Sequence, residues 1–175
     1  MEDLKYPIGK YHYAGWHSAE ARKALIMELA LLPTSYREIT TGLTDIQLDT
    51  PYRPEGWTLR QVIHHVPDSH ANGYIRFKLA LTEQQPTIKP YDEAKWAELP
   101  DTFQTPIEVS LAMLEVIHFR WITLLRNLSE EQFKATYFHP ESKTVNTLDY
   151  SLGMYVWHGK HHLAQIESLR TRMKW

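Results

Sequence analysis

The sequence contains no cysteine, and this absence restricts its covalent and its metal chemistry. A chain without cysteine forms no disulfide, and any metal that it binds must be held by histidine, aspartate or glutamate. The sequence also has no apolar run near the roughly 20 residues that a membrane-spanning helix needs. The segment Met1–Pro7 lacks the basic and apolar regions of a signal peptide. We therefore expect a cytoplasmic protein with no membrane partner.

The chain also has little net charge. Its 19 Lys and Arg residues nearly balance 21 Asp and Glu residues, which gives −2 with neutral histidines. Such a balance offers no basic surface for a polyanion, so we expect no nucleic-acid partner. The composition, 43% hydrophobic and 23% charged, is typical of a globular protein. A length of 175 residues predicts one domain over residues 1–175.

Helix-capping signals organise the first half of the chain. Ser18 can begin a helix that Pro33 breaks or restarts. The segment Thr44–Gln47 has the form of a capping box and opens a short helix. A second capping box, Thr58–Gln61, starts a long helix. Pro67 lies inside it, and because an interior proline costs about 3 kcal/mol, we expect a kink there.

The second half of the chain is also predicted to be mainly helical. Residues 84–104 are expected to be mostly loop. The segment Thr105–Glu108 offers a cap, a proline at the first helical position and a glutamate, which together indicate the start of another long helix. Residues 135–139 and 143–147 can form a small hairpin, and Thr147 caps a final long helix. Long helices with short connections favour an all-α helix bundle.

His158 and His162 are spaced four residues apart in the last predicted helix. This spacing places both side chains on one helix face, where two imidazoles can share a divalent cation. At about 100° per residue, both histidines lie on one flank of the apolar face, whereas His161 points toward solvent. The alternative is that His158 and His162 are boundary residues without a chemical role.

A second group of histidines, in the segment His64–His70, could supply a third ligand. Helical periodicity places His70 near the middle of the apolar face and His64 and His65 at its two boundaries. Periodicity therefore favours His70, although Pro67 can shift the helical phase. The alternative interpretation of His70 is a buried, hydrogen-bonded histidine. Asp68 could accept the second ring proton of a ligand histidine, or it could be a solvated acid.

Several segments together resemble one family. They are Tyr6–Gly9, Gln47–Arg53, Gly56–His65, Asp68–His70, Tyr74–Lys78, Pro90–Asp92 and Tyr155–His158. The chain resembles the DinB-like superfamily and, within it, the YfiT-like metal-dependent hydrolases. The resemblance implies an up-and-down four-helix bundle that binds one divalent metal ion through three histidines. Imidazole ligands suit zinc, nickel, copper and iron, and of these we expect Zn²⁺ or Ni²⁺. The resemblance assigns these ligands to His65, His158 and His162, and thus overrules the periodicity that favours His70.

The resemblance also has two departures. The chain has Val66-Pro67 where the family usually has Leu-Ala, beside the ligand position. Gln165 stands where the family often has a further histidine, which is not one of the three ligands. The resemblance further implies a homodimer and a small-molecule substrate.

Three neutral imidazoles leave a metal with at least one open position, as in catalytic zinc sites. An open zinc lowers the pKa of bound water to about 7, which favours hydrolysis, or it binds a thiol as thiolate. Gly159 occupies the place of the glutamate base in the peptidase motif His-Glu-x-x-His, so a peptidase of this type is not expected. No catalytic residue is assigned. The family resemblance implies a hydrolase. The alternatives are an S-transferase that uses a low-molecular-weight thiol of the bacillithiol type, and a metal-binding protein without turnover.

Overall fold

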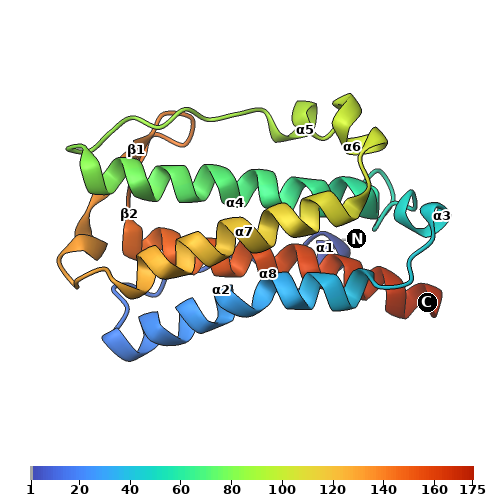
Figure 1. Ribbon diagram of the computed structural model, residues 1–175, viewed down its shortest axis with the longest axis horizontal. Helices are drawn as coiled ribbons and strands as arrows, with labels where there is room; N and C mark the ends of the chain where they lie inside the picture. Colours follow the sequence, from blue (N-terminus) through green and yellow to red (C-terminus); the bar gives the residue numbers. More distant parts are fainter. Residues whose placement is uncertain (1) are drawn as a thin grey trace.

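Four long helices form a bundle in the computed structural model, which describes residues 2–175 (Figure 1). The long helices are α2 (Ala19–Thr40), α4 (Leu59–Thr82), α7 (Ile107–Arg126) and α8 (Leu148–Met173). The shorter elements are α1 (Glu2–Lys5), α3 (Asp45–Leu48), α5 (Glu93–Trp96), α6 (Pro100–Gln104), the 3₁₀ helix η1 (Gln132–Lys134), β1 (Thr136–His139) and β2 (Thr144–Thr147). The predicted four-helix bundle is confirmed, as is the hairpin, in which β1 pairs antiparallel with β2.

The directions of the helices differ from the alternation expected of an up-and-down bundle. Between His64 and His70 on α4, the hydrogen-bonded partners on α7 advance from Ser110 to His118. The two helices therefore run parallel, and contacts between α2 and α8 also advance together. The segment 83–106 accounts for this arrangement, because it returns along the outside of the bundle before α7 begins (Figure 1). Capping signals cannot reveal such a return.

Most of the predicted helices begin at the predicted residue, and each of these is capped by a side chain. A backbone N–H at the third helical position bonds to the side chain of Ser18, Thr44, Thr58 and Thr147. Both predicted capping boxes, at Thr44 and Thr58, are complete. The predicted start of a long helix in Thr105–Glu108 is confirmed, because α7 begins at Ile107. The capping role expected of Thr105 was wrong, because Thr105 ends α6 and α7 has no side-chain cap.

Neither interior proline interrupts its helix. Helix α2 continues through Pro33 to Thr40, so the predicted break at Pro33 was wrong. Pro33 has no N–H to donate to the carbonyl of Leu29, four residues earlier. That carbonyl instead accepts a hydrogen bond from Nδ1 of His118 at 2.8 Å. Helix α4 likewise runs through Pro67.

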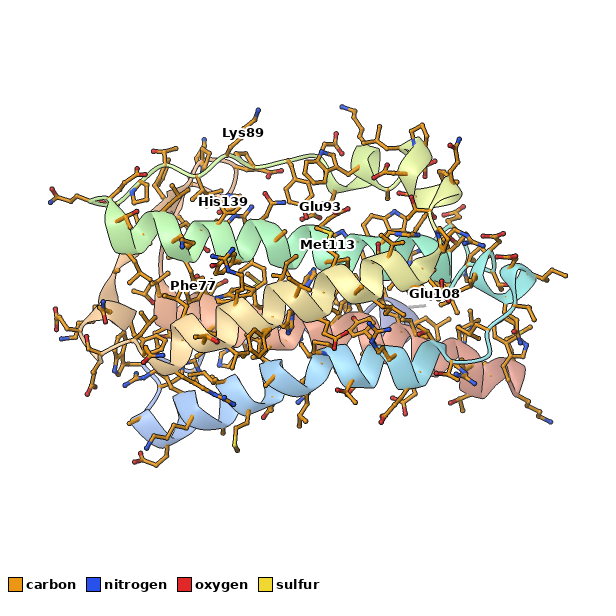
Figure 2. The ribbon with its side chains drawn as sticks, in the orientation of Figure 1. Phe77, Lys89, Glu93, Glu108, Met113 and His139 are labelled. Carbon is orange, nitrogen blue, oxygen red and sulfur yellow. The ribbon has the colours of Figure 1, made fainter. Side chains whose placement is uncertain are left out.

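Aromatic side chains fill the centre of the bundle. Trp121 is fully buried and lies edge-on to Phe77 and Tyr155, with ring centroids 5.2 and 5.1 Å apart. Figure 2 shows Phe77 inside the bundle, whereas Lys89 points outward from the return segment. Gly73 allows this packing, because a Cβ there would lie 2.5 Å from Cζ of Tyr155. No helix of the described residues is long and apolar enough to span a bilayer.

Candidate metal centre

Three histidines from two helices converge on one point. His65 extends from α4, and His158 and His162 extend from α8. One nitrogen of each ring lies within 4.8 Å of the corresponding nitrogens of the other two. The Nε2 atoms of His65 and His158 are 3.2 Å apart. Two imidazole nitrogens on a tetrahedral zinc are roughly 3.3 Å apart, given Zn–N distances of about 2.05 Å, so this pair has the separation of two ligands of one metal ion.

Burial keeps these imidazoles neutral, the state in which a histidine binds a metal. Burial lowers the pKa of His65 to about 4. The pKa values of His158 and His162 lie well below their ordinary value, first because of burial and then because of the neighbouring histidines. Trp57 packs against His65, with ring centroids 4.8 Å apart. Of the three, His65 and His162 are buried, and His158 is partly buried.

Gln165 determines which nitrogen of His162 faces the centre. Its Oε1 lies 2.8 Å from Nδ1 of His162, and its Nε2 donates to the carbonyl oxygen of Lys5 at 3.1 Å. A carbonyl can only accept, so the amide nitrogen must face Lys5 and the amide oxygen must face His162. His162 therefore carries its proton on Nδ1, and its Nε2 is free for a metal. Sequence reasoning noted Gln165 only as a departure from the family.

His70 lies behind the centre rather than in the group of converging nitrogens. It is fully buried, and its Nε2 is 3.2 Å from Nδ1 of His158. Its Nδ1 is 2.8 Å from Nε2 of His118, which is also buried. The interpretation of His70 as a buried, hydrogen-bonded histidine is confirmed. Sequence reasoning did not identify His118, which lies 48 residues further along the chain.

The prediction that His161 points toward solvent was wrong. Its exposed fraction is 6%, because the N-terminal segment lies along this side of α8. Tyr6 packs on the His161 ring at 5.6 Å, and Trp157 stacks on it at 4.7 Å. Helical geometry alone cannot show that another part of the chain covers a face.

Asp68 is half-buried, and burial and then the nearby Asp101 raise its pKa to about 6. The second nitrogens of His158 and His162 bond to His70 and Gln165, so Asp68 does not orient these two histidines. A role of Asp68 beside His65 stays a prediction.

Gly159, next to His158, brings α8 close to α2. A Cβ at this position would lie 2.3 Å from Cδ1 of Leu32, and Tyr36 donates a hydrogen bond to the Gly159 carbonyl at 2.8 Å. Because this position packs against α2, it has no room for the glutamate base of a helical zinc peptidase.

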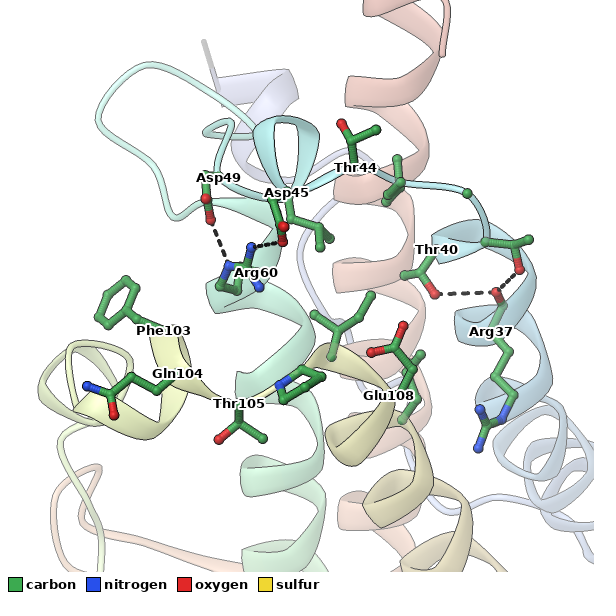
Figure 3. Close-up of a pocket in the computed structure, with 17 residues that line it drawn as sticks. Arg37, Thr40, Thr44, Asp45, Asp49, Arg60, Phe103, Gln104, Thr105 and Glu108 are labelled. Atoms are coloured by element: carbon green, nitrogen blue, oxygen red, sulfur yellow. Dashed lines mark hydrogen bonds and ion pairs between the residues drawn. The ribbon is translucent and has the colours of Figure 1, made fainter.

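A large pocket lies elsewhere in the described structure and has a different chemistry. Its volume is about 1060 Å³. It lies between the end of α2 and the beginnings of α4 and α7, as Figure 3 shows. The two arginines of the pocket are paired. Arg60 bonds to Asp45 and Asp49 at 2.8 and 2.7 Å, and Arg37 pairs with Glu115 at 2.6 Å. With these charges neutralised, the pocket does not present a free cationic site, and none of the three histidines lines it.

The fold and the centre define a class of protein, a four-helix bundle in which three histidines from two helices converge. Comparison with known families narrows this class. The sequence profile of the DinB superfamily matches residues 28–166, and the chain belongs to that superfamily.

Relatives match over the full chain. A protein of Bacillus mycoides (strain KBAB4) and one of Bacillus cereus (strain ATCC 10987 / NRS 248) are 51% and 52% identical to it over 175 residues, which is all of each protein. Both carry the name "putative metal-dependent hydrolase". Among solved structures, YfiT from Bacillus subtilis matches with a TM-score of 0.97 and 48% identity, over 99% of each chain. Its description is a probable metal-dependent hydrolase with an unusual four-helix bundle topology.

Proposed function

We propose that the protein is a metal-dependent hydrolase that binds one divalent ion per chain, Zn²⁺ or Ni²⁺, through His65, His158 and His162. One observation carries this proposal: three neutral imidazoles converge, and no fourth His, Asp or Glu of the described residues joins their group. Three protein ligands leave a metal with an open position, as in catalytic sites. Imidazole ligands suit both zinc and nickel. The names of the relatives agree with this assignment.

Each residue of the proposed centre has a separate task. When bound, the metal would supply Lewis acidity, which activates water or polarises a carbonyl. His70 and Gln165 orient the ligand rings, and Trp57 covers the His65 side of the centre. A small-molecule substrate would enter beside the half-buried His158.

Transfer of a thiol to an electrophile is the second candidate. It is favoured by the packing of Gly159 against Leu32, which leaves no room for a base beside His158. A metal ion that deprotonates a coordinated thiol makes such a base unnecessary.

Activity assays on the metal-loaded protein separate these functions. We expect the wild-type protein to hydrolyse members of an ester and amide panel, and the His158→Ala/His162→Ala variant to be inactive. His139→Ala, a histidine of the hairpin, is the matched control and should keep full activity. Consumption of a thiol by an electrophile without any hydrolysis would instead identify an S-transferase. Metal binding without either reaction would identify a metal-binding protein without turnover.

We also propose that the protein forms a homodimer through the outer face of α2 and α7. Leu31, Val116 and Phe119 on these neighbouring helices are 63%, 63% and 77% exposed. Exposed large apolar side chains on the outer faces of neighbouring helices are typical of interaction surfaces. Light scattering after size exclusion should give twice the chain mass for the wild-type protein and one chain mass for Phe119→Glu. Ile46→Glu, on the exposed α3, is the control. A monomeric wild-type protein would disprove the dimer.

A further inference from the structure

A row of hydrogen bonds crosses the bundle from His158 to the backbone of α2. His158 Nδ1 is 3.2 Å from His70 Nε2, and His70 Nδ1 is 2.8 Å from His118 Nε2. His118 Nδ1 is 2.8 Å from the carbonyl oxygen of Leu29. The four residues come from α8, α4, α7 and α2, so each long helix contributes one member. We call this row the histidine chain.

Pro33 leaves the carbonyl at the end of the histidine chain without its helical partner. In a regular helix, the carbonyl of Leu29 would accept the N–H of residue 33. Proline has no N–H, so this buried carbonyl needs another donor. His118 supplies it. Pro33 therefore leaves the Leu29 carbonyl free to accept the hydrogen bond from His118 that ends the histidine chain.

The carbonyl determines the position of every proton along the histidine chain. Because a carbonyl oxygen only accepts, His118 must carry its proton on Nδ1. A neutral imidazole has one N–H, so Nε2 of His118 accepts from Nδ1 of His70. Nε2 of His70 in turn accepts from Nδ1 of His158. Nε2 of His158 then has no proton, and this is the atom that lies 3.2 Å from Nε2 of His65.

The opposite set of tautomers, with the proton of each ring on Nε2, is unfavourable. It would leave a bare Nδ1 of His118 facing the Leu29 carbonyl at 2.8 Å, with two acceptors in contact. A charged imidazolium is also disfavoured, because His70 and His118 are 0% and 2% exposed. The His70 ring lies against Trp121 and Tyr155, which bring no charge to it.

We propose that His118 and His70 are positioning residues, which hold His158 in the tautomer that presents Nε2 to the metal. The role of this tautomer in metal binding rests on the proposed function, whereas the tautomer itself is a property of the metal-free protein. The histidine chain ends on a backbone carbonyl, which does not pass on a proton, so its role is to orient His158 rather than to conduct protons.

Nitrogen NMR of the metal-free protein tests the proposal directly. Two-bond proton–nitrogen spectra of ¹⁵N-labelled protein distinguish a protonated ring nitrogen from a bare one. We expect His118, His70 and His158 all to carry the proton on Nδ1. Protonation of Nε2 in His158 would overturn the proposal, whether or not the protein binds a metal. The tautomer proposal can therefore be disproved even if the proposed function is correct, and the proposed function can be disproved even if the tautomer proposal is correct.

Variants of His118 test the consequence for metal affinity. His118 lies beyond His70 and does not contact the three proposed ligands, yet His118→Phe should weaken Zn²⁺ binding about 10- to 100-fold in competition with a chelator. His118→Gln should restore most of the affinity, because its side-chain oxygen can accept from His70. His64→Phe is the matched control, since His64 is buried on α4 and bonds to Ser110 at 2.6 Å. Equal Zn²⁺ affinities of His118→Phe and His64→Phe would overturn the proposal.

Discussion

Gln165 accepts a hydrogen bond from Nδ1 of His162 at 2.8 Å and donates one to the carbonyl of Lys5. This glutamine thereby connects a proposed ligand to the backbone of the N-terminal segment. The two proposed ligands on α8, His158 and His162, are thus oriented in the same way, because each ring is held by hydrogen bonds that end on a backbone carbonyl. For His162 that carbonyl belongs to Lys5, and for His158 it belongs to Leu29.

Replacing Gln165 with methionine should weaken metal binding without unfolding the protein. The methionine has a similar volume but offers only a weak thioether acceptor to His162, so the ring loses the strong partner that fixes its tautomer. We expect Zn²⁺ affinity to fall about 10- to 100-fold, measured by chelator competition. The helical circular dichroism of the metal-free variant should match the wild type. Unchanged affinity would show that Gln165 does not orient the ligand.

Asp149 should be one of the most sensitive positions for stability. Its buried carboxylate accepts from Tyr13 at 2.7 Å, from His17 at 2.9 Å and from Arg22 at 3.0 Å. Asp149→Asn removes the buried charged partner of Arg22, which then has only the exposed Glu130, at 3.4 Å. We expect a loss of about 3–5 kcal/mol in the free energy of unfolding, measured with urea.

The control for Asp149 is an ion pair on the surface. Glu115 pairs with Arg37 at 2.6 Å, but both side chains are exposed. Glu115→Gln should therefore cost no more than about 1 kcal/mol. Equal losses for Asp149→Asn and Glu115→Gln would contradict the importance of the buried carboxylate.

Gly73→Ala should destabilise the core although alanine favours a helix. The added Cβ would lie 2.5 Å from Tyr155 Cζ and 2.7 Å from Trp121. Both rings are buried and cannot move away easily. The overpacking costs about 1–3 kcal/mol, which exceeds or cancels the gain of about 1 kcal/mol from helix propensity. A melting temperature above that of the wild-type protein would contradict this account of the packing.

The metal-free protein should lose stability as the pH falls below about 6.5. Burial lowers the pKa of His65, His118 and His161 to about 4. Between these values the unfolded chain takes up protons that the folded protein does not, so each group removes roughly 1.4 kcal/mol per pH unit. Asp68 has the opposite effect, because burial and Asp101 raise its pKa to about 6 and its protonation favours the folded state as the pH falls. It offsets the effect of only one histidine.

Urea unfolding at about pH 7.5 and about pH 5 measures this pH dependence. His161→Phe removes one of the buried imidazoles, so its loss of stability between the two pH values should be smaller than that of the wild-type protein. A wild-type stability that does not change over this range would contradict the burial of neutral histidines.

The sequence predicts the helices better than their arrangement. Local signals explain this success, because the caps at Ser18, Thr44, Thr58 and Thr147 depend on neighbouring residues only. The parallel course of α4 and α7 depends on the path of segment 83–106, which carries no comparable local signal. Fold class was therefore predictable, and helix direction was not.

The candidate site was predictable in part for the same reason. The spacing of His158 and His162 on one helix identifies a pair, but only the family resemblance selects His65 over His70. The burial of His161 depends on the N-terminal segment, and the role of His118 depends on a contact between α7 and α4. Pro33 was a usable signal, since an interior proline leaves a carbonyl that some side chain must satisfy.

The central claim is that His65, His158 and His162 together bind one metal ion, and metal stoichiometry tests it most directly. Purified, untagged protein would be stripped, reloaded with Zn²⁺ or Ni²⁺, and assayed for bound metal by elemental analysis. The account predicts about one ion per chain for the wild-type protein and for His139→Ala, and none for His158→Ala/His162→Ala. Full binding by the double variant, or no binding by the wild-type protein, would contradict it.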